Sequence, residues 1–293
     1  MKQDWKRLIP LLVHIQANLD QDLALAGLSR KAGLSPFHLQ RLFKAVIGET
    51  PKAYTSRLRV ERAAFRLLIH ESSVLDIALE CGFQNHETFI RAVRRRFGKS
   101  PRDYRKWVQG EVASWNEHVQ EGLPDAVQAF EISATKVIRL RPMHLAFRRH
   151  VGPYESVPES IFDELEQWAA AGPGRQLPGP PVWLGIGQDA PFTTPPERLR
   201  FDAALVVPGP FAPEGRIGYQ FLEGGHFAVT THAGSYETLP AAYAAIFPRV
   251  MGLAGYQFVG LPVVEIYHSA RVNVRYQLNH TDICLPVAPP LLA

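Results

Sequence analysis

The stretch SPFHLQRLFKAVIGETPKAY, residues 35–54, decides the fold of the first third of the chain, because a later stretch repeats its plan. Residues 85–104 read NHETFIRAVRRRFGKSPRDY, and both stretches end on a glycine, two polar residues, a proline and a tyrosine. Each is preceded by a glycine, Gly33 or Gly82, and by a shorter segment with helical spacing. A glycine between two helical segments is typical of a tight turn. The repeat therefore predicts two helix-turn-helix units.

The longer helix of each unit has a start signal and an amphipathic pattern. Ser35 before Pro36 is an N-cap with proline at the first helical position, and Asn85 can cap the second helix. Apolar residues then recur at helical spacing. They are Leu39, Leu42, Phe43 and Val46 in the first unit and Phe89, Ala92, Val93 and Phe97 in the second. The opposite faces are polar, so we expect them at the surface.

Residues 51–69 join the two units and read as one helix. At ~1.5 Å per residue such a helix spans ~28 Å, close to the ~34 Å between successive major grooves on one face of DNA. Residues 1–110 hold 20 Lys and Arg against 10 Asp and Glu, a net charge of +10, whereas the rest of the chain holds 12 against 18, a net charge of −6. A basic first part is typical of a domain that binds a polyanion.

Two unequal helix-turn-helix units with a joining helix resemble the DNA-binding domain of the AraC/XylS family. The segments SPFHLQRLFK and FIRAVRRRFGKSPRDYR carry this resemblance, which covers about residues 8–107. It implies an all-α domain over residues 1–108 that reads two adjacent major grooves of double-stranded DNA as a monomer. The DNA contacts that it implies are Phe37, His38, Gln40 and Arg41 in the first unit and His86, Glu87, Thr88, Arg91 and Arg95 in the second.

The chemistry of these side chains suits base recognition. Arginine can bind guanine with two hydrogen bonds, glutamine can pair with adenine, and an aromatic ring or the threonine methyl group can contact thymine. Glu87 could accept from cytosine or repel phosphate. The arginines at 94–96 and those of the joining helix, Arg57, Arg59, Arg62 and Arg66, are expected on phosphates.

The second half of the chain contains its own repeat. Residues 150–158 read HVGPYESVP and residues 232–240 read HAGSYETLP. An alternating strand pattern precedes each phrase, a helical pattern follows it, and two further strand-like segments come after the helix. Ser156 and Glu159 match a capping box, and Thr238 is the matching cap. We therefore interpret the phrase as a strand-to-helix turn; a catalytic role of its histidine and glutamate is the alternative.

Duplicated strand–helix–strand–strand units with this turn resemble the GyrI-like effector-binding domain, over about residues 130–289. The resemblance implies an α+β domain whose ligand site lies between the two halves, with aromatic walls and one buried acid. The strand VVEIY, residues 263–267, supplies Glu265 in an apolar run. The expected ligand-binding residues are Glu265, Tyr267, Trp183, Tyr219, Tyr243 and Phe247. A cationic or apolar effector suits an acid among aromatic rings.

Glu265 has an alternative interpretation. It could face solvent or pair with Arg271 or Arg275, in which case the aromatic residues would be ordinary core residues. The two cysteines, Cys81 and Cys284, are too few for a disulfide framework or a zinc site, so no metal and no cofactor are expected. No stretch is long and apolar enough for a membrane span, and the first residues lack a cleavage site, so the cytoplasm is the expected location.

The sequence thus predicts a multidomain protein: residues 1–108 bind DNA, residues 109–129 form a connector with a short helix, and residues 130–293 bind an effector. The expected function is transcription regulation, with the effector altering DNA affinity or contact with RNA polymerase, and no enzyme activity. Two alternatives stay open. One is a hydrolase of reactive small molecules that uses Glu265 as a base, and the other is a second domain that binds only protein partners.

Overall fold

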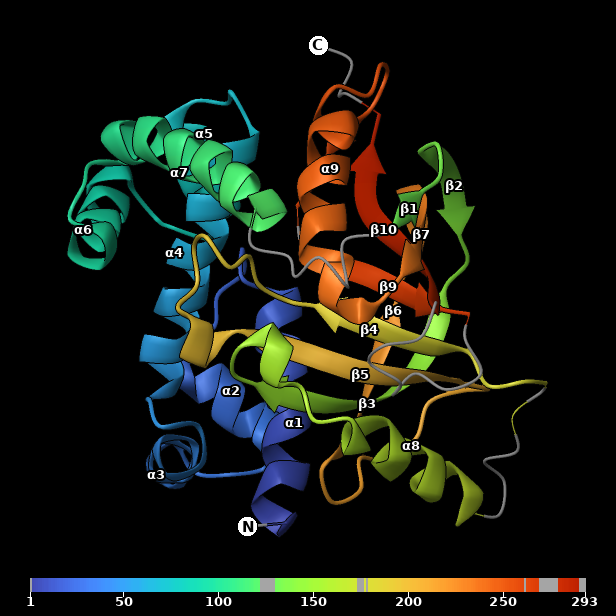
Figure 1. Cartoon of the computed structure of the whole chain (residues 1–293). Helices are drawn as coiled ribbons and strands as arrows, with labels where there is room; N and C mark the ends of the chain where they lie inside the picture. The colour runs from blue at the N-terminus through green and yellow to red at the C-terminus, as the bar shows by residue number, and fades with distance from the viewer. Residues whose placement is uncertain are drawn as a thin grey trace. The chain divides into compact units, whose positions relative to one another are not determined.

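The computed structural model describes residues 2–121, 130–172, 177, 179–260, 262–268 and 279–289. The chain divides into two compact units, residues 1–109 with 211–219 and residues 110–210 with 220–293 (Figure 1). The expected class, an all-α domain followed by an α+β domain, is confirmed. The expected boundaries at 108, 109–129 and 130 stay a prediction.

The first unit is built from helices, which carry the two predicted helix-turn-helix pairs α2–α3 and α5–α6. The helices are α1 (Lys2–Ala17), α2 (Leu25–Ala32), α3 (Pro36–Ile47), α4 (Pro51–Ile69), α5 (Val74–Glu80), α6 (His86–Phe97) and α7 (Pro101–Glu121). Helix α4 joins the pairs over the predicted residues 51–69. Of the predicted apolar faces, Leu39 and Phe43 in α3 and Phe89 and Val93 in α6 are fully buried.

The caps that the sequence predicts start α3 and α6, the second helix of each helix-turn-helix pair, which we call the recognition helices. The Ser35 hydroxyl accepts a hydrogen bond from the backbone N–H of His38 at 3.2 Å, and the Asn85 side chain accepts one from Thr88 at 2.9 Å. These bonds satisfy N–H groups that have no partner inside the helix. The sequence therefore fixes where the exposed face of each recognition helix begins.

The two turn glycines have the same backbone conformation but different surroundings. Gly33 has φ of 63° and Gly82 has φ of 81°, both in the left-handed region that favours glycine. A Cβ at Gly33 would meet nothing within 4 Å, whereas a Cβ at Gly82 would lie well inside contact distance of the Leu19 carbonyl oxygen and beside Arg59. The second turn is thus packed against the end of α1, and the first is open.

Helix α7 extends the first unit into the expected connector. It runs from Pro101 to Glu121, so that residues 109–121 are helical rather than loosely structured. The remaining connector residues, 122–129, lie outside the described residues.

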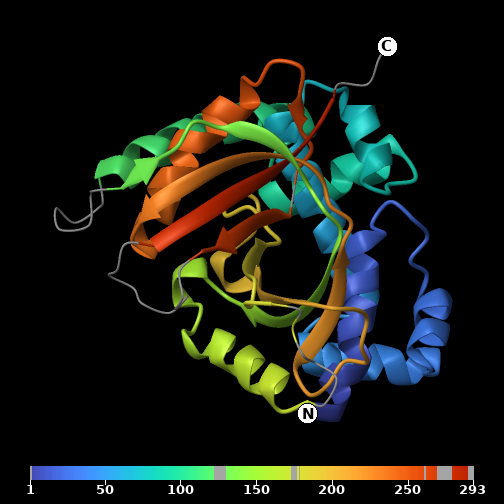
Figure 2. The same ribbon diagram turned by 90° about the vertical axis from the view of Figure 1, so that its right-hand side faces the viewer.

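The described residues form a ten-stranded sheet, which belongs to the second unit except for residues 217–219 of β6, and the second unit also carries helices α8 and α9 (Figure 2). Its strands are β1 (Glu131–Ile132), β2 (Lys136–Leu140), β3 (Met143–Val151), β4 (Trp183–Gly187), β5 (Arg200–Val207), β6 (Ile217–Leu222), β7 (Gly225–Gly234), β8 (Gln257–Phe258), β9 (Val263–Tyr267) and β10 (Asn279–Ala288). Helix α8 (Ser160–Ala170) and helix α9 (Leu239–Met251) follow β3 and β7. The strand order is β1-β7-β10-β9-β4-β5-β3-β6, with β2 paired to β7 and β8 to β10.

The predicted duplication is visible in this order. One copy is β3, α8, β4 and β5, and the other is β7, α9, β9 and β10. The copies meet where β4 pairs with β9, with Trp183 opposite Tyr267 and Gly185 opposite Glu265. Residues that are directly opposite in an antiparallel pair point to the same face. The rings of Phe162 in α8 and Tyr267 in β9 contact each other, so this face is the one that the helices cover.

The predicted caps of α8 and α9 are wrong. A short 3-10 helix, Tyr154–Ser156 or Tyr236–Thr238, intervenes in each copy before the α-helix begins. Glu159, and not Ser156, is the N-cap of α8; Thr238 stands at the predicted N-cap position of α9, but its side chain makes no capping hydrogen bond. Their hydroxyls instead donate back to the backbone carbonyls of Pro153 and Ser235, both at 2.7 Å. In each copy the predicted capping hydroxyl thus bonds to a carbonyl three residues earlier in the turn and not to the start of the α-helix.

Candidate functional sites

The two recognition helices present the predicted DNA-contacting side chains to solvent. Phe37 is 76% exposed, which is unusual for a large apolar ring, and it lies two residues after Ser35, the N-cap of α3. The other predicted residues are also exposed: His38, Gln40, Arg41, His86, Glu87, Thr88, Arg91 and Arg95. Their roles on DNA stay predictions, but each side chain is accessible to a partner.

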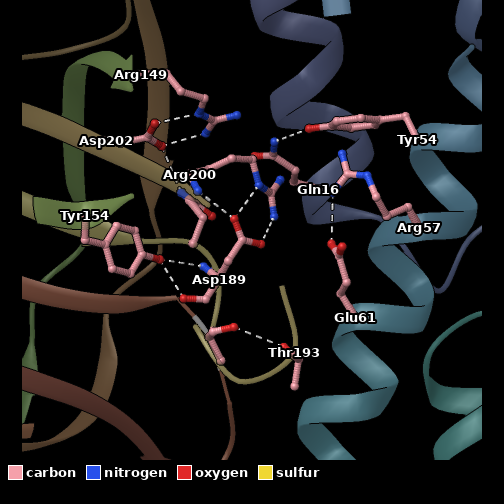
Figure 3. A network of polar contacts seen from close by, with 12 residues as sticks. Gln16, Tyr54, Arg57, Glu61, Arg149, Tyr154, Asp189, Thr193, Arg200 and Asp202 are labelled. Atoms are coloured by element: carbon pink, nitrogen blue, oxygen red, sulfur yellow. Dashed lines mark hydrogen bonds and ion pairs between the residues drawn. The ribbon is translucent and has the colours of Figure 1, made fainter. Parts of the chain in front are cut away.

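Three arginines of the joining helix have partners within the first unit, in contrast to the expectation of phosphate contacts. Arg57 forms ion pairs with Glu49 at 2.6 Å and with Glu61 at 2.9 Å, and only 13% of its side chain is exposed (Figure 3). Arg59 donates to the carbonyls of Leu19 and Gln21, both at 2.7 Å.

Arg66 completes this set of paired arginines by forming an ion pair with Glu80 of α5. These three guanidinium groups thus have partners in the protein, and their predicted contacts with phosphates would compete with those bonds. The arginines at 94–96 in α6 are exposed and remain candidates for phosphate contacts.

Glu265 is the centre of the candidate ligand site in the second unit. Its side chain lies on β9, is 9% exposed, and accepts hydrogen bonds from the hydroxyls of Tyr243 at 2.8 Å and Tyr267 at 2.5 Å. Burial raises the pKa of Glu265, although the two phenol hydrogen bonds act in the opposite direction. The described partners of Glu265 are thus hydroxyl donors. Arg271 and Arg275, the partners of the alternative interpretation, lie outside the described residues, so that pairing stays an alternative prediction.

Aromatic rings surround this carboxylate. The ring of Tyr267 has edge-to-face contacts with Phe162 and with Tyr236, both at 5.7 Å between centroids. Phe162 also contacts Trp183 edge-on at 5.9 Å. Burial and the nearby Glu265 raise the pKa values of Tyr243, Tyr267 and Tyr236, so these phenols stay protonated and act as donors at neutral pH. We call the group formed by Glu265, Tyr236, Tyr243, Tyr267, Phe162 and Trp183 the acid–aromatic cluster.

The sequence predicted four members of the acid–aromatic cluster: Glu265, Tyr267, Tyr243 and Trp183. Two other predicted residues lie elsewhere. Tyr219 is on β6, which is separated from β9 by three strands, and its ring packs against Phe211. Phe247 lies one turn beyond Tyr243 on α9, where its ring packs edge-on against Phe258. Strands are ~4.8 Å apart, so Tyr219 is far from the carboxylate.

Sequence reasoning missed Tyr154 and Tyr236, although a signal for both was present. They are the equivalent tyrosines of HVGPYE and HAGSYE, which were interpreted only as turn residues. The Tyr236 ring contacts Tyr267. The pKa of Tyr154 is raised by burial and by its acidic neighbours, which include Glu265. The repeated tyrosine therefore brings one ring from each copy toward the same carboxylate.

A buried ion pair holds Tyr154 in place (Figure 3). Its hydroxyl donates to the Asp189 carbonyl at 2.6 Å. The Asp189 carboxylate accepts from the Arg200 guanidinium at 2.5 and 2.8 Å and from the Arg200 backbone N–H at 2.8 Å. A bidentate pair with this many bonds is rigid. The loop that follows β4 is thereby fixed against Tyr154.

The repeated histidines have a structural explanation in the same turns. Nε2 of His232 lies 2.7 Å from the Thr238 hydroxyl, and Nε2 of His150 lies 3.2 Å from the Ser156 hydroxyl. Each hydroxyl already donates to a carbonyl, so the histidine must be the donor. Burial lowers the pKa of His232 to about 4, which keeps this imidazole neutral. Since the Ser156 and Thr238 hydroxyls donate to backbone carbonyls and accept from the histidines, these bonds close the turns.

The described residues contain no group of three or more His, Cys, Asp or Glu side chains placed to hold a metal ion. Cys81 and Cys284 are buried and unpaired, and burial raises the pKa of Cys81 to about 11. None of the helices in the described ranges combines the length and the apolar character that a bilayer crossing requires.

Two family models match this sequence. The family described as "Helix-turn-helix domain" matches residues 28–106, and the family described as "GyrI-like small molecule binding domain" matches residues 134–288. The second match covers more than half of the chain. Together the two matches contain both recognition helices and the whole acid–aromatic cluster.

Individual relatives match the first unit. "Right origin-binding protein" of Escherichia coli strain K12 is 40% identical over 96 residues, which are 33% of this chain and 33% of that protein. "Regulatory protein SoxS" of the same strain is 36% identical over 95 residues, 32% of this chain and 89% of that protein. The match thus spans one third of the length of the first relative. A solved AraC-type transcriptional regulator from Chromobacterium violaceum is 31% identical and covers 34% of this chain and 89% of its own, with a TM-score of 0.33.

Proposed function

We propose that this chain regulates transcription by binding double-stranded DNA and one small molecule, because it belongs to the AraC/XylS family and carries a C-terminal GyrI-like small molecule binding domain. The observation that carries the DNA-binding part is the pair of capped recognition helices with wholly exposed polar faces in a domain of net charge +10. Such a protein works in the cytoplasm, where its DNA is.

The DNA-binding part is tested on the base readout of Arg41. A randomised duplex library is selected with the full-length protein, and the affinities of the wild type, Arg41→Ala and Arg41→Lys are compared on the selected site and its single-base variants. If Arg41 reads a guanine, both variants lose discrimination at one base position, by ~1–3 kcal/mol, because lysine lacks the guanidinium fork. An equal loss on all sequences that lysine restores would make Arg41 a phosphate contact instead.

The ligand part of the proposal is that the acid–aromatic cluster binds an apolar cation. A buried carboxylate needs a partner to be stable as an ion, and aromatic faces attract quaternary ammonium groups. The phenols of Tyr243 and Tyr267 favour the ionised form of Glu265, which would attract a cation.

A suitable probe is (4-hydroxyphenyl)trimethylammonium, with binding measured by calorimetry on the full-length protein. Glu265→Gln is expected to weaken binding at least tenfold. The matched control is Glu164→Gln, because Glu164 is half exposed and pairs with Arg148 outside the cluster. Equal binding by the wild type and by Glu265→Gln would refute a role for the carboxylate.

We further propose that the bound molecule is sensed and not converted. The hydroxyl of Tyr267 lies 2.5 Å from Glu265, so a carboxylate base with a phenol acid is the arrangement that a hydrolase would use. Incubation of the protein with electrophilic small molecules, followed by product analysis, separates the two functions. Turnover that Glu265→Gln abolishes would establish the enzyme instead.

Effector binding must act by favouring one of two states of the protein. We propose that these states differ in the connector region, residues 109–129, and that they change DNA affinity or contact with RNA polymerase. Limited proteolysis of the connector in the presence and absence of the ammonium probe tests this. Identical cleavage with the probe fully bound would refute the connector as the changing element.

A further inference from the structure

The register of β4 and β9 makes Gly185 the counterpart of Glu265. The two strands are antiparallel neighbours, and Gly185 lies opposite Glu265 at the middle of their pairing. The two-fold rotation that exchanges the copies therefore exchanges these two residues, which are 80 positions apart. One copy carries the buried acid of the cluster, and the other has no side chain at the same place.

A second pair of residues confirms this correspondence. Asp202 accepts from Arg149 at 2.6 Å and from the side chain of Gln188 at 2.9 Å. Its counterpart, Asp282, accepts from Thr231 at 2.6 Å and lies 2.8 Å from Nε2 of His268. Asp202 and Asp282, like Gln188 and His268, are 80 residues apart, and Arg149 and Thr231 are 82 apart. The offset of 80 residues thus holds on both sides of position 185, so Gly185 and Glu265 occupy corresponding places in the two copies.

The space that a side chain at position 185 would need is occupied by Tyr267. A Cβ built on Gly185 would lie well inside contact distance of the Tyr267 hydroxyl, and 2.7 Å from the nearest ring atom of Phe201. The same hydroxyl donates to Glu265 at 2.5 Å. The absence of a side chain at Gly185 is therefore what allows this phenol to lie beside the carboxylate.

A second acid at this position would also be unfavourable. Directly opposite residues in an antiparallel pair have Cβ atoms ~5 Å apart. Two buried carboxylates at that distance repel, so that one would keep its proton. With glycine at 185, the cluster holds a single acid that accepts hydrogen bonds from two phenols.

We propose that Gly185 is a specificity-determining residue of the acid–aromatic cluster: by leaving room for the Tyr267 hydroxyl, it sets the preference for a cation over an uncharged molecule of the same shape. The inference rests on the proposed binding of a small molecule by this cluster. Gly185 acts through Tyr267 and is a positioning residue. Without the phenol the carboxylate loses a hydrogen bond that favours its ionised form, and its attraction for a cation falls while the aromatic walls remain.

The test compares two probes on the full-length protein at pH 7, namely (4-hydroxyphenyl)trimethylammonium and its uncharged carbon isostere 4-tert-butylphenol. Gly185→Ala is expected to lower the ratio of cation to neutral affinity by about tenfold or more, since a hydrogen bond to a charged group is lost. Tyr267→Phe should lower the ratio equally. Gly187→Ala is the matched control in the same strand, because its Cβ would meet the Tyr154 hydroxyl only at an ordinary 3.6 Å.

The double variant Gly185→Ala/Tyr267→Phe separates this inference from a general packing defect. In the Tyr267→Phe background the alanine should cause no further loss of selectivity, because the hydroxyl that it displaces is already absent. Because the Cβ also meets the Phe201 ring at 2.7 Å in both backgrounds, thermal unfolding of each variant is measured beside its affinity ratio, and only the ratio is compared.

Two results would overturn the inference. One is an affinity ratio in Gly185→Ala that equals the wild-type ratio, and the other is an equal loss of selectivity caused by alanine in both backgrounds. These leave the proposed function intact if Glu265→Gln still abolishes cation binding. A wild-type protein that binds neither probe would overturn the proposed ligand and this inference together.

Discussion

Replacing Gly82 by alanine should damage the first unit far more than the same change at Gly33. Both glycines end the first helix of their unit with the same pair of hydrogen bonds. Their own N–H groups donate to residues three positions back, at 2.9 and 3.1 Å, and the next N–H groups reach five positions back, both at 3.0 Å. The sequence repeat, the backbone conformation and the turn chemistry are therefore matched, and only the surroundings differ.

The magnitude follows from those surroundings. An L-residue in the left-handed conformation costs ~1–2 kcal/mol, and this cost applies at both positions. At Gly82 the new Cβ would also displace the Leu19 carbonyl or the Arg59 guanidinium, which are joined by a hydrogen bond of 2.7 Å. Losing a hydrogen bond to a charged group costs ~1.5–3 kcal/mol. We therefore expect a loss of about 3–5 kcal/mol for Gly82→Ala and about 1–2 kcal/mol for Gly33→Ala.

Hydrogen exchange measured by mass spectrometry on the full-length protein is the suitable assay, because it reports the opening free energy of α4, α5 and α6 separately from the second unit. Arg59→Lys serves as a second control, since it weakens the same contact without changing the turn. Losses for Gly82→Ala and Gly33→Ala that agree within ~0.5 kcal/mol would refute the packing argument and leave only the shared backbone cost.

Three further predictions follow from single contacts. The pKa of His232 is about 4 in the folded protein, so between its ordinary value near 6.5 and pH 4 the unfolded chain binds one more proton than the folded chain. The free energy of unfolding should therefore fall by up to about 3 kcal/mol as the pH decreases from about 6.5 to about 4. Urea unfolding of His232→Asn should lack this pH-dependent component. Arg57→Ala should lower the free energy of unfolding in urea by about 3 kcal/mol, because it removes the cation that pairs with Glu49 and Glu61, and it should leave base preference unchanged. Arg41→Ala should change base preference and leave the free energy of unfolding unchanged. Altered base preference in Arg57→Ala would contradict this assignment. Asp202→Asn, at a buried ion pair with Arg149, should cost about 3 kcal/mol. Its counterpart Asp282 is 23% exposed and pairs with the half-exposed His268, so Asp282→Asn should cost under about 1 kcal/mol; equal losses in thermal unfolding would be inconsistent with the burial difference.

Much of the fold could be predicted because its signals are local. Helix α4 has its predicted bounds since Thr50 caps it, at 3.2 Å to the Ala53 N–H, and Pro51 fills its first position. Strands β5 and β9 also have their predicted bounds. The S-x-x-E box failed because a histidine six residues earlier competes for the Ser156 hydroxyl. Strands β1 and β2 lie outside the repeat, and their pairing with β7 is a long-range contact that no local pattern shows.

The candidate ligand site was only partly predictable for the same reason. Glu265 stood out as an acid in an apolar run, and Tyr267 two residues later must lie on the same face of the strand. Tyr219 is aromatic, as expected for a residue that lines the ligand site, but the residue type does not show the order of the strands. Its strand, β6, lies at the edge of the sheet, away from β9. The role of Gly185 depends on which strand pairs with β9, so only the register shows it.

The repeated segments HVGPYESVP and HAGSYETLP explain why both copies contribute to the candidate ligand site. In each copy its histidine reaches past a glycine to the Ser or Thr hydroxyl; a Cβ on Gly152 or Gly234 would lie 3.0 Å from Nε2 of that histidine. The turn so formed projects the tyrosine of the phrase toward the seam between β4 and β9. Because duplication places both turns symmetrically about that seam, Tyr154 and Tyr236 approach one carboxylate from opposite copies. A single ligand between the copies needs one acid and not two, and at the place where β4 pairs with β9 one copy has glutamate and the other glycine.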